Sequence, residues 1–355
     1  MSSSRFRPRV VSVVVALAFA VAACTGVGAP TAPSASSPAA SPSAASAPPA
    51  EPVKLVVGLG YIPSVQFAPF YLAQQEGWYA DAGLDVEFQN KIDPDLITLV
   101  GQGAIDIGLG DGTSVIPAVS QGIPVRYLAT VYGLFPSVVF AKASSGIATA
   151  ADLEGRKIGT PGRYGSSWIM LQALLGSAGL TTEDVEIVEY PDFTQRAAVE
   201  QGVVDAATGF ANNEPVQLEL AGQPAVVLRI DDITPLPGPG LISGVSTLEA
   251  KRDAIAAFVN TTLRAMDAIA ADPEAGLDAA IVAVPELATA REAQLAVLEA
   301  TIESWRGPLQ ASGGLGAIDL DGWTASIEYL SSLGLVPNPV TVDDLVRDDL
   351  IGAGG

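Results

Sequence analysis

The chain has 355 residues with 39 Asp and Glu against 18 Lys and Arg, which gives a formal net charge of −21, and 49% of its residues are hydrophobic. So acidic a chain is unsuited to bind nucleic acid. It contains no histidine and a single cysteine, Cys24, so we expect no imidazole or thiolate metal site, no histidine acid–base catalysis and no cofactor.

The first residues have the pattern of a bacterial secretory signal. Arg5, Arg7 and Arg9 precede the apolar run Val10–Ala23, which is shorter than the roughly 20 residues of a membrane-spanning helix. Small residues directly before Cys24 resemble a lipobox, and this cysteine has no possible disulfide partner in the chain. We expect residues 1–23 to be a signal peptide and Cys24 to carry a lipid. A plain signal peptide with a chance cysteine is the alternative.

The next segment, residues 24–52, is composed almost wholly of Ala, Ser, Pro, Gly and Thr. It holds too few apolar side chains to offset the entropy of ordering, so we expect a disordered tether between the lipid and a folded part. The remaining residues, about 300, exceed the usual size of a single core, which favours two lobes.

The first half of the folded part alternates strands and helices. Strands are expected at 54–59, 85–88, 105–109, 125–132 and 137–140, and helices at 69–83, 94–102 and 113–121. Tyr61, Gln66 and Phe67 follow the first strand, at the edge where open α/β sheets bind ligands. Phe70 and Tyr71 are better interpreted as core residues of the helix. Asp111 and Thr113 form a turn after another strand, with Thr113 or Ser114 capping the next helix.

Two segments repeat at an offset of about a hundred residues. AGLDVEF at 82–88 is echoed by AGL at 178–180 and DVEI at 184–187, and QGAID at 102–106 is echoed by QGVVD at 201–205. Because both echoes occur in the same order, we infer two related α/β lobes.

The second lobe supplies two further candidate loops. A strand near 157–159 leads into Tyr164, Gly165, Ser166 and Ser167 at the start of a helix that runs to Ser177. The free N–H groups there suit an anion or a polar ligand group, although the two serines could equally be helix caps.

The other loop, Gly209–Pro215, contains Phe210, Asn213 and Glu214. These side chains could cover the face of a flat heterocycle and hydrogen-bond its edge. Equally, Asn213 could be only an N-cap, with Pro215 in the first turn.

The last third of the chain is mostly helical. Strands are expected at 226–230 and 241–245, followed by helices at 247–271, 273–284, 289–305 and 319–333. This order suggests that the chain returns through the loop 235–240 and finishes on the first lobe.

Five segments carry a family resemblance. They are FAPFYLAQQEGWYADAGLDVEF, GQGAIDIG, VSQGIPVRYLATV, ADLEGRKIGTPGRYG and FANNEPVQL. Together they resemble the periplasmic solute-binding proteins of ABC importers, in the branch related to thiamine pyrimidine-precursor binding proteins, with alkanesulfonate and taurine binders as relatives. The resemblance implies an α/β, type II periplasmic-binding-protein fold: two α/β lobes with a ligand cleft and hinge, and a helical C-terminal region packed on lobe 1. We place the crossovers near 140–145 and 230–241.

These crossovers divide the chain into a first lobe at 53–142, a second lobe at 143–235 and a return to the first at 236–355. The resemblance further implies that the candidate loops face the ligand and that Glu214 meets a ring amino group or a protonated nitrogen. It implies an ABC permease and ATPase as partners of an extracytoplasmic, lipid-anchored protein. We expect a monomer that does not bind nucleic acid.

Several functions remain open. A thiamine pyrimidine precursor, of the hydroxymethylpyrimidine or formylaminopyrimidine type, is the first choice of ligand. Riboflavin, an alkanesulfonate or taurine, and a non-transport sensor lipoprotein are alternatives. Arg163 would suit a sulfonate, whereas Glu214 would repel one. Eukaryotic relatives in this family make the thiamine pyrimidine with a histidine and a cysteine-rich iron motif; this chain lacks both, so we expect no enzyme.

Overall fold

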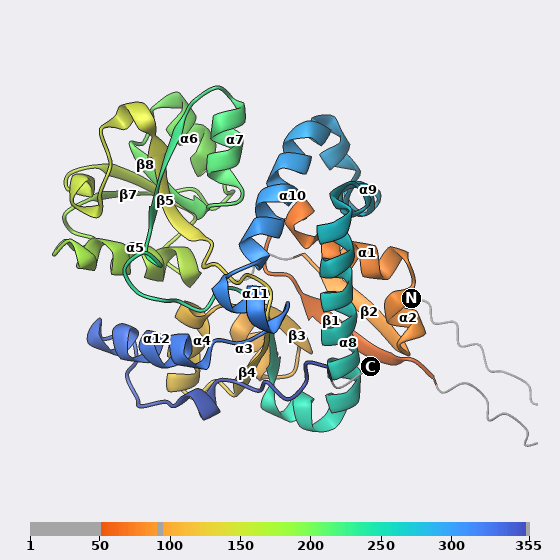
Figure 1. Ribbon diagram of the computed structural model, residues 1–355. Helices are drawn as coiled ribbons and strands as arrows, with labels where there is room; N and C mark the ends of the chain where they lie inside the picture. The colour runs from red at the N-terminus through yellow and green to blue at the C-terminus, as the bar shows by residue number, and fades with distance from the viewer. Residues whose placement is uncertain (1–50, 91–94, 353–355) are drawn as a thin grey trace, which may run out of the picture. The chain divides into compact units, whose positions relative to one another are not determined.

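The computed structural model describes residues 51–90 and 95–352 (Figure 1). The predicted signal peptide, the predicted lipid attachment at Cys24 and nearly all of the predicted tether lie outside these ranges. Two five-stranded mixed sheets, each covered by helices, form the folded part.

The first sheet has the strand order β2-β1-β3-β10-β4. β1 pairs in parallel with β2 and β3, and β10 runs antiparallel to β3 and β4. The strands are β1 (Val53–Gly58), β2 (Leu84–Gln89), β3 (Ile107–Gly110), β4 (Val125–Thr130) and β10 (Gly240–Gly244). Their apolar residues alternate or run continuously, as in sheets that are buried on both faces.

The second sheet has the order β7-β6-β8-β5-β9. β6 pairs in parallel with β7 and β8, and β5 runs antiparallel to β8 and β9. The strands are β5 (Ser137–Lys142), β6 (Lys157–Thr160), β7 (Glu186–Glu189), β8 (Ala206–Phe210) and β9 (Ala225–Arg229). This is the topology of the first sheet, repeated.

The sequence repeat is confirmed in the backbone pairing. In the first sheet the Asp106 carboxylate accepts from the Val56 N–H at 2.9 Å, and the Asp106 N–H donates to the Val56 carbonyl. In the second sheet Asp205 makes the same two bonds with Lys157, again with 2.9 Å to the carboxylate. The repeated aspartate therefore joins the start of one parallel strand to its neighbour.

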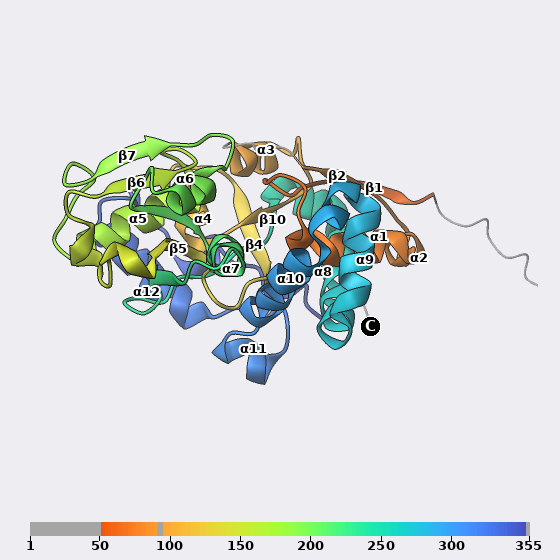
Figure 2. The ribbon, with the colours of Figure 1, turned by 90° about the horizontal axis from the view of Figure 1, so that it is seen from above.

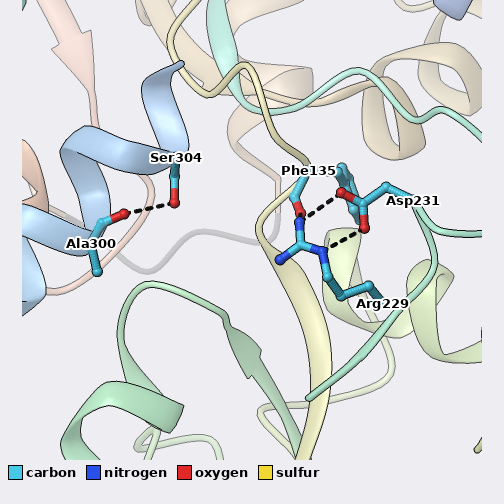
Figure 3. A network of polar contacts seen from close by, with 5 residues as sticks. All are labelled: Phe135, Arg229, Asp231, Ala300 and Ser304. Atoms are coloured by element: carbon cyan, nitrogen blue, oxygen red, sulfur yellow. Dashed lines mark hydrogen bonds and ion pairs between the residues drawn. The ribbon is translucent and has the colours of Figure 1, made fainter. Parts of the chain in front are cut away.

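The chain passes between the sheets through residues 131–136 and 230–239. β5 belongs to the second sheet, so the first passage lies before β5, and the predicted crossover near 140–145 was several residues late. The pattern of β5 is that of any buried strand and does not reveal its partners. Arg229 links the two passages: it donates to the Phe135 carbonyl at 2.9 Å and to both carboxylate oxygens of Asp231 (Figure 3).

The helices before residue 245 connect the strands. They are α1 (Ala68–Gln75), α2 (Trp78–Asp81), α3 (Leu96–Gly101), α4 (Gly112–Ser120), α5 (Gly165–Ser177), α6 (Gln195–Gln201) and α7 (Glu214–Leu220), with 3-10 turns at Val65–Phe67 (η1), Ala143–Ser145 and Ala150–Leu153. Phe70 and Tyr71 of α1 are buried, as predicted.

The C-terminal helices pack mainly on the first sheet. They are α8 (Val245–Ala271), α9 (Pro273–Ala283), α10 (Arg291–Trp305), α11 (Pro308–Gly313) and α12 (Leu320–Ser332), with 3-10 turns at Pro285–Ala290 and Val342–Asp344. α8 and α9 lie beside α1 in both views (Figures 1 and 2). The Tyr79 ring stacks on Phe258 of α8 at 4.9 Å, and its hydroxyl lies 2.8 Å from the Thr262 hydroxyl. α12 reaches further, since the Tyr329 hydroxyl donates to the Ala173 carbonyl of α5.

Candidate ligand site

A pocket of about 250 Å³ lies where strands of both sheets end. Gly60 follows β1, Asp111 follows β3, Pro161 follows β6 and Phe210 ends β8, so four parallel strands bring their carboxyl ends to it. This is the edge at which open α/β sheets bind ligands. The volume is slightly below the range of about 300–1,000 Å³ that is usual for small-molecule pockets.

Eleven of the twelve residues predicted to bind a ligand line this pocket. They are Tyr61, Gln66, Phe67, Asp111, Tyr164, Gly165, Ser166, Ser167, Phe210, Asn213 and Glu214. Thr113 does not line it. Its side chain is fully buried, and its hydroxyl donates to the Asp111 carboxylate at 2.5 Å. Thr113 therefore holds Asp111 in place and does not face the pocket.

Asp111 caps α4, where Thr113 or Ser114 was predicted to do so. Its Oδ1 accepts from the backbone N–H of Ser114 at 3.0 Å and from Thr113. The prediction failed because an aspartate with extended backbone directly before a helix competes for the same position. Burial raises the pKa of the Asp111 carboxyl, while hydrogen bonds from Thr113, from Ser166 of α5 and from Ser114 oppose the shift.

Glu214 begins α7, and its carboxylate folds back over the end of β8. One oxygen accepts from the Phe210 N–H at 2.7 Å and the other from the Asn213 amide at 3.0 Å. Gly209 leaves room for this, because a Cβ there would lie 2.8 Å from the Glu214 carboxylate. The side chain is 6% exposed, and this burial raises the pKa of its carboxyl. Asn213 is the N-cap by position, but its side chain does not cap the helix.

The N-terminus of α5 opens toward the pocket without a side-chain cap. Tyr164 stands at the N-cap position, and Gly165 has a φ of 66°, which favours glycine. Neither Ser166 nor Ser167 is the cap, so the capping alternative does not explain them. The Ser137 hydroxyl lies 3.4 Å from the Ser166 hydroxyl.

Aromatic rings line the pocket from both sheets. Tyr61, which follows β1, meets Phe193, which follows β7, edge to face at 5.0 Å between ring centres. Tyr132 and Phe210 form a second such pair at 6.4 Å. Burial, and then the charge of Glu214, raise the pKa of the Tyr61 hydroxyl, so this group stays a neutral hydrogen-bonding partner.

Sequence reasoning missed several lining residues. They include Tyr132, Phe193, Gln195 and Pro239. Tyr132 lies two residues after β4, whereas the expected strand 125–132 included it, so it was not among the loop residues considered. Phe193 has a φ of 58°, a conformation rare for a residue with a side chain, and no sequence pattern marks it.

The pocket is acidic. Asp111 and Glu214 line it, and no lysine or arginine is among its described lining residues. Arg163, the residue predicted to suit a sulfonate, lies outside the lining. Its guanidinium pairs with Glu189 at 3.1 Å and covers the Trp168 ring at 5.3 Å. The pocket therefore suits a neutral or cationic ligand.

Within residues 51–90 and 95–352, no group of three His, Cys, Asp or Glu side chains is placed to hold a metal ion. No helix in that same part of the chain has the length and hydropathy to cross a membrane.

Residues 64–276, more than half of the chain, match the family described as NMT1/THI5 like. The chain belongs to this family. It is 33% identical over 352 residues to the riboflavin-binding protein RibY of Chloroflexus aurantiacus, covering 98% of both chains. It is 26% identical over 297 residues to the formylaminopyrimidine-binding protein of Halalkalibacterium halodurans, covering 81% of this chain and 88% of that protein.

Other members of the family are named as enzymes. The chain is 29% identical over 169 residues to the 4-amino-5-hydroxymethyl-2-methylpyrimidine phosphate synthase of Legionella pneumophila, covering 47% of this chain and 52% of that one. Family membership alone therefore does not separate binding proteins from synthases.

The fold is that of the periplasmic binding proteins, as the sequence predicted. The alkanesulfonate-binding protein SsuA of Xanthomonas axonopodis pv. citri, bound to MOPS, superposes with a TM-score of 0.65 over 84% of this chain and 99% of that one. At 20% identity this similarity concerns the fold and not the ligand. The chain thus combines membership of the NMT1/THI5 like family with the fold of the periplasmic binding proteins, and the two relatives above that it matches over 98% and 81% of its length are named as binding proteins.

Proposed function

We propose that this protein is the extracytoplasmic receptor of an ABC importer and that it captures a flat, uncharged or cationic aromatic heterocycle. The observation that carries the proposal is the composition of the pocket. Aromatic rings from both sheets surround it, two buried carboxylates face it, and its described lining holds no basic side chain. Rings can stack on or meet a flat ligand edge to face, while carboxylates accept from its N–H or O–H groups.

Riboflavin is the first ligand we propose. The relative named as a riboflavin-binding protein matches nearly the whole chain, whereas the formylaminopyrimidine-binding protein matches 81% of it at lower identity. Six aromatic residues line the pocket, which favours a ligand with an extended ring system: Tyr61, Phe67, Tyr132, Tyr164, Phe193 and Phe210. The order of our two candidates is thus reversed relative to the sequence-based choice.

A thiamine pyrimidine precursor is the second candidate. Glu214 favours it, because a buried carboxylate is a strong acceptor for an exocyclic amino group or a protonated ring nitrogen. A sulfonate is the weakest candidate, since Asp111 and Glu214 would repel its charge and Arg163 pairs elsewhere.

We propose that the protein has no catalytic activity. The synthase chemistry implied by the family resemblance uses a histidine and several cysteines, and this sequence has no histidine and one cysteine. The two buried carboxylates can orient a ligand by accepting hydrogen bonds.

We propose that a lipid on Cys24 anchors the protein to the membrane. Replacing Cys24 with serine removes the only thiol in the chain. The variant should move from the membrane fraction to the soluble fraction of cells that export it. If it stays with the membrane, the anchor is not a lipid on this cysteine.

Binding is tested by thermal denaturation of the purified protein with riboflavin, hydroxymethylpyrimidine, formylaminopyrimidine, thiamine, taurine and an alkanesulfonate. A ligand at a hundredfold over its Kd adds about 2.7 kcal/mol to the free energy of unfolding, which is a clear shift in Tm. We expect riboflavin to give the largest shift. A shift with taurine or the alkanesulfonate alone would contradict the proposal.

Glu214→Gln tests the role of the carboxylate. It keeps an acceptor for the Phe210 N–H but removes the charge and the acceptor of the Asn213 amide, so we expect binding of the ligand found above to weaken by about 1–3 kcal/mol. Isothermal titration of both proteins measures this. Ser177→Ala is the control and should bind the ligand as the wild type does. Ser177 is the last residue of α5 and does not line the pocket. Equal affinity of Glu214→Gln and wild type would remove this carboxylate from the ligand contacts.

A further inference from the structure

Asn212 joins the two sheets without lining the pocket. It follows β8 of the second sheet and is 1% exposed. Its amide nitrogen donates to the Gln66 Oε1 at 2.8 Å and to the Thr301 hydroxyl at 2.8 Å. Gln66 belongs to η1, and Thr301 belongs to α10, whose apolar side chains share the core of the first sheet. One buried amide of the second sheet thus holds two elements of the first.

These bonds also decide which way the Gln66 amide points. Its oxygen accepts from Asn212 and, at 3.5 Å, from the Tyr132 hydroxyl, while its nitrogen donates to the Ser64 hydroxyl at 3.2 Å. An amide offers one acceptor oxygen and two N–H hydrogens. If the Gln66 amide turned over, its nitrogen would face the nitrogen of Asn212, donor against donor. The capacity that Gln66 retains for a ligand is therefore a single N–H.

The bridge leaves one polar atom unsatisfied. The Asn212 Oδ1 is buried and has no hydrogen-bond partner among the described residues. A buried acceptor without a partner disfavours the conformation that buries it, and water can reach this atom if the sheets move apart. The two hydrogen bonds of Asn212 favour approach of the sheets, whereas burial of its unsatisfied oxygen opposes it. A ligand that contacts both sheets can therefore shift the equilibrium between the separated and the bridged arrangement.

We propose that Asn212 is a positioning residue: it ties approach of the two sheets to one orientation of Gln66, so that the pocket presents an N–H to an acceptor atom of the ligand. This inference rests on the proposed function, because riboflavin and the pyrimidine precursors carry carbonyl oxygens or ring nitrogens that accept such a bond. It adds the requirement that an acceptor of the ligand lies against Gln66.

Two variants and a matched control test the proposal with riboflavin as the probe. In Asn212→Asp the carboxylate can only accept, so Gln66 must turn over and present its oxygen; Thr301→Val removes one acceptor of the bridge. Thr262→Val is the control. Like Thr301, Thr262 is fully buried, donates to the carbonyl four residues earlier and lies beside another side-chain donor, but it lies outside the bridge and the pocket.

We expect Asn212→Asp to raise the riboflavin Kd at least about tenfold and Thr301→Val to raise it about threefold, from the loss of single hydrogen bonds. Thr262→Val should bind riboflavin as the wild type does, although both threonine variants lose comparable thermal stability. Quenching of riboflavin fluorescence gives the Kd. If Asn212→Asp and Thr301→Val bind like the Thr262→Val control, the proposal is wrong.

A second measurement separates this inference from the proposed function. Spin labels are attached at two exposed positions, Val203→Cys after α6 on the second sheet and Val282→Cys in α9 on the first. The full chain carries Cys24→Ser so that no other thiol is labelled, and the distance between the two labels is measured. We expect Asn212→Ala, which removes both bonds of the bridge, to lengthen this distance without any ligand, while Thr262→Val leaves it unchanged. If the wild type binds no probe, the proposed function fails but this distance still tests the bridge. Identical distances in all the variants would overturn the bridge.

Discussion

The two sheets have one topology but different surroundings. In both, an aspartate at the start of the third strand accepts from a backbone N–H of the first, Asp106 in one sheet and Asp205 in the other. The first sheet is also covered by α8, which follows β10, and Lys251 of this helix pairs with Asp106 at 2.8 Å. Asp205 has only Arg156 at 3.8 Å and is 40% exposed, against 11% for Asp106. The repeated sequence determines how the strands pair, and the C-terminal helices bury the aspartate of the first sheet more deeply than that of the second.

This difference predicts unequal costs for the same substitution. Asp106→Ala removes the carboxylate that accepts from the Val56 N–H and pairs with the partly exposed Lys251 ammonium, which keeps its bond to the Lys54 carbonyl at 2.9 Å, so we expect a loss of about 2 kcal/mol in the free energy of unfolding. Asp205→Ala loses a backbone bond and a weak, exposed ion pair, so we expect about 1 kcal/mol. Urea unfolding of both variants measures the difference. Equal losses would mean that the helical cover of the first sheet adds nothing at this position.

The bond between the two passages of the chain can be tested in the same way. Arg229→Ala removes the bonds to the Phe135 carbonyl and to Asp231 that hold the two passages together (Figure 3). Both side chains are largely buried, and we expect a loss of about 1–2 kcal/mol.

Arg163→Ala is the matched control for Arg229→Ala. It breaks an arginine–carboxylate pair within the second sheet region in which both side chains are about half exposed, so its loss should stay below about 1 kcal/mol. Chemical unfolding compares the two. If Arg163→Ala costs as much as Arg229→Ala, the bonds between the passages have no special weight.

The smallest effect concerns pH and the carboxyl that each sheet contributes to the pocket. Burial raises the pKa of both Asp111 and Glu214. The folded protein then keeps protons that the unfolded chain has lost, so the free energy of unfolding should fall as the pH rises above the ordinary values of 3.8 and 4.5.

Exposed aspartates with a lowered pKa, such as Asp152 and Asp184, have the opposite effect on stability. They reduce the free energy of unfolding only as the pH falls below 3.8. The two windows are therefore separable. The double variant Asp111→Asn with Glu214→Gln should lose the decline above pH 4.5 when urea unfolding is followed against pH. An unchanged decline would assign it to other groups.

Much of this architecture followed from local pattern. Alternating apolar residues and turn-forming glycines located the strands, and the repeated aspartates predicted two related lobes. The candidate loops met in one pocket because the carboxyl ends of parallel strands lie at one edge of a sheet, so each strand's position also placed the loop after it.

Long-range pairing was beyond such reasoning. β5 has the sequence of a generic buried strand, and only its pairing with β8 and β9 assigns it to the second sheet. Phe193 faces the pocket through a rare backbone conformation, and the capping of α4 by Asp111 depends on the backbone before the helix.

The sequence by itself determined the repeated α/β lobes, the acidic character of the chain and most of the loops that form the pocket, because these depend on composition and on periodicity along the chain. Only the tertiary structure decided that Arg163 lies outside the pocket and that Asn212 orients Gln66 from the opposite sheet. Such contacts join residues far apart in the sequence, here 146 positions, and a pattern along the chain carries no record of which side chains meet across space.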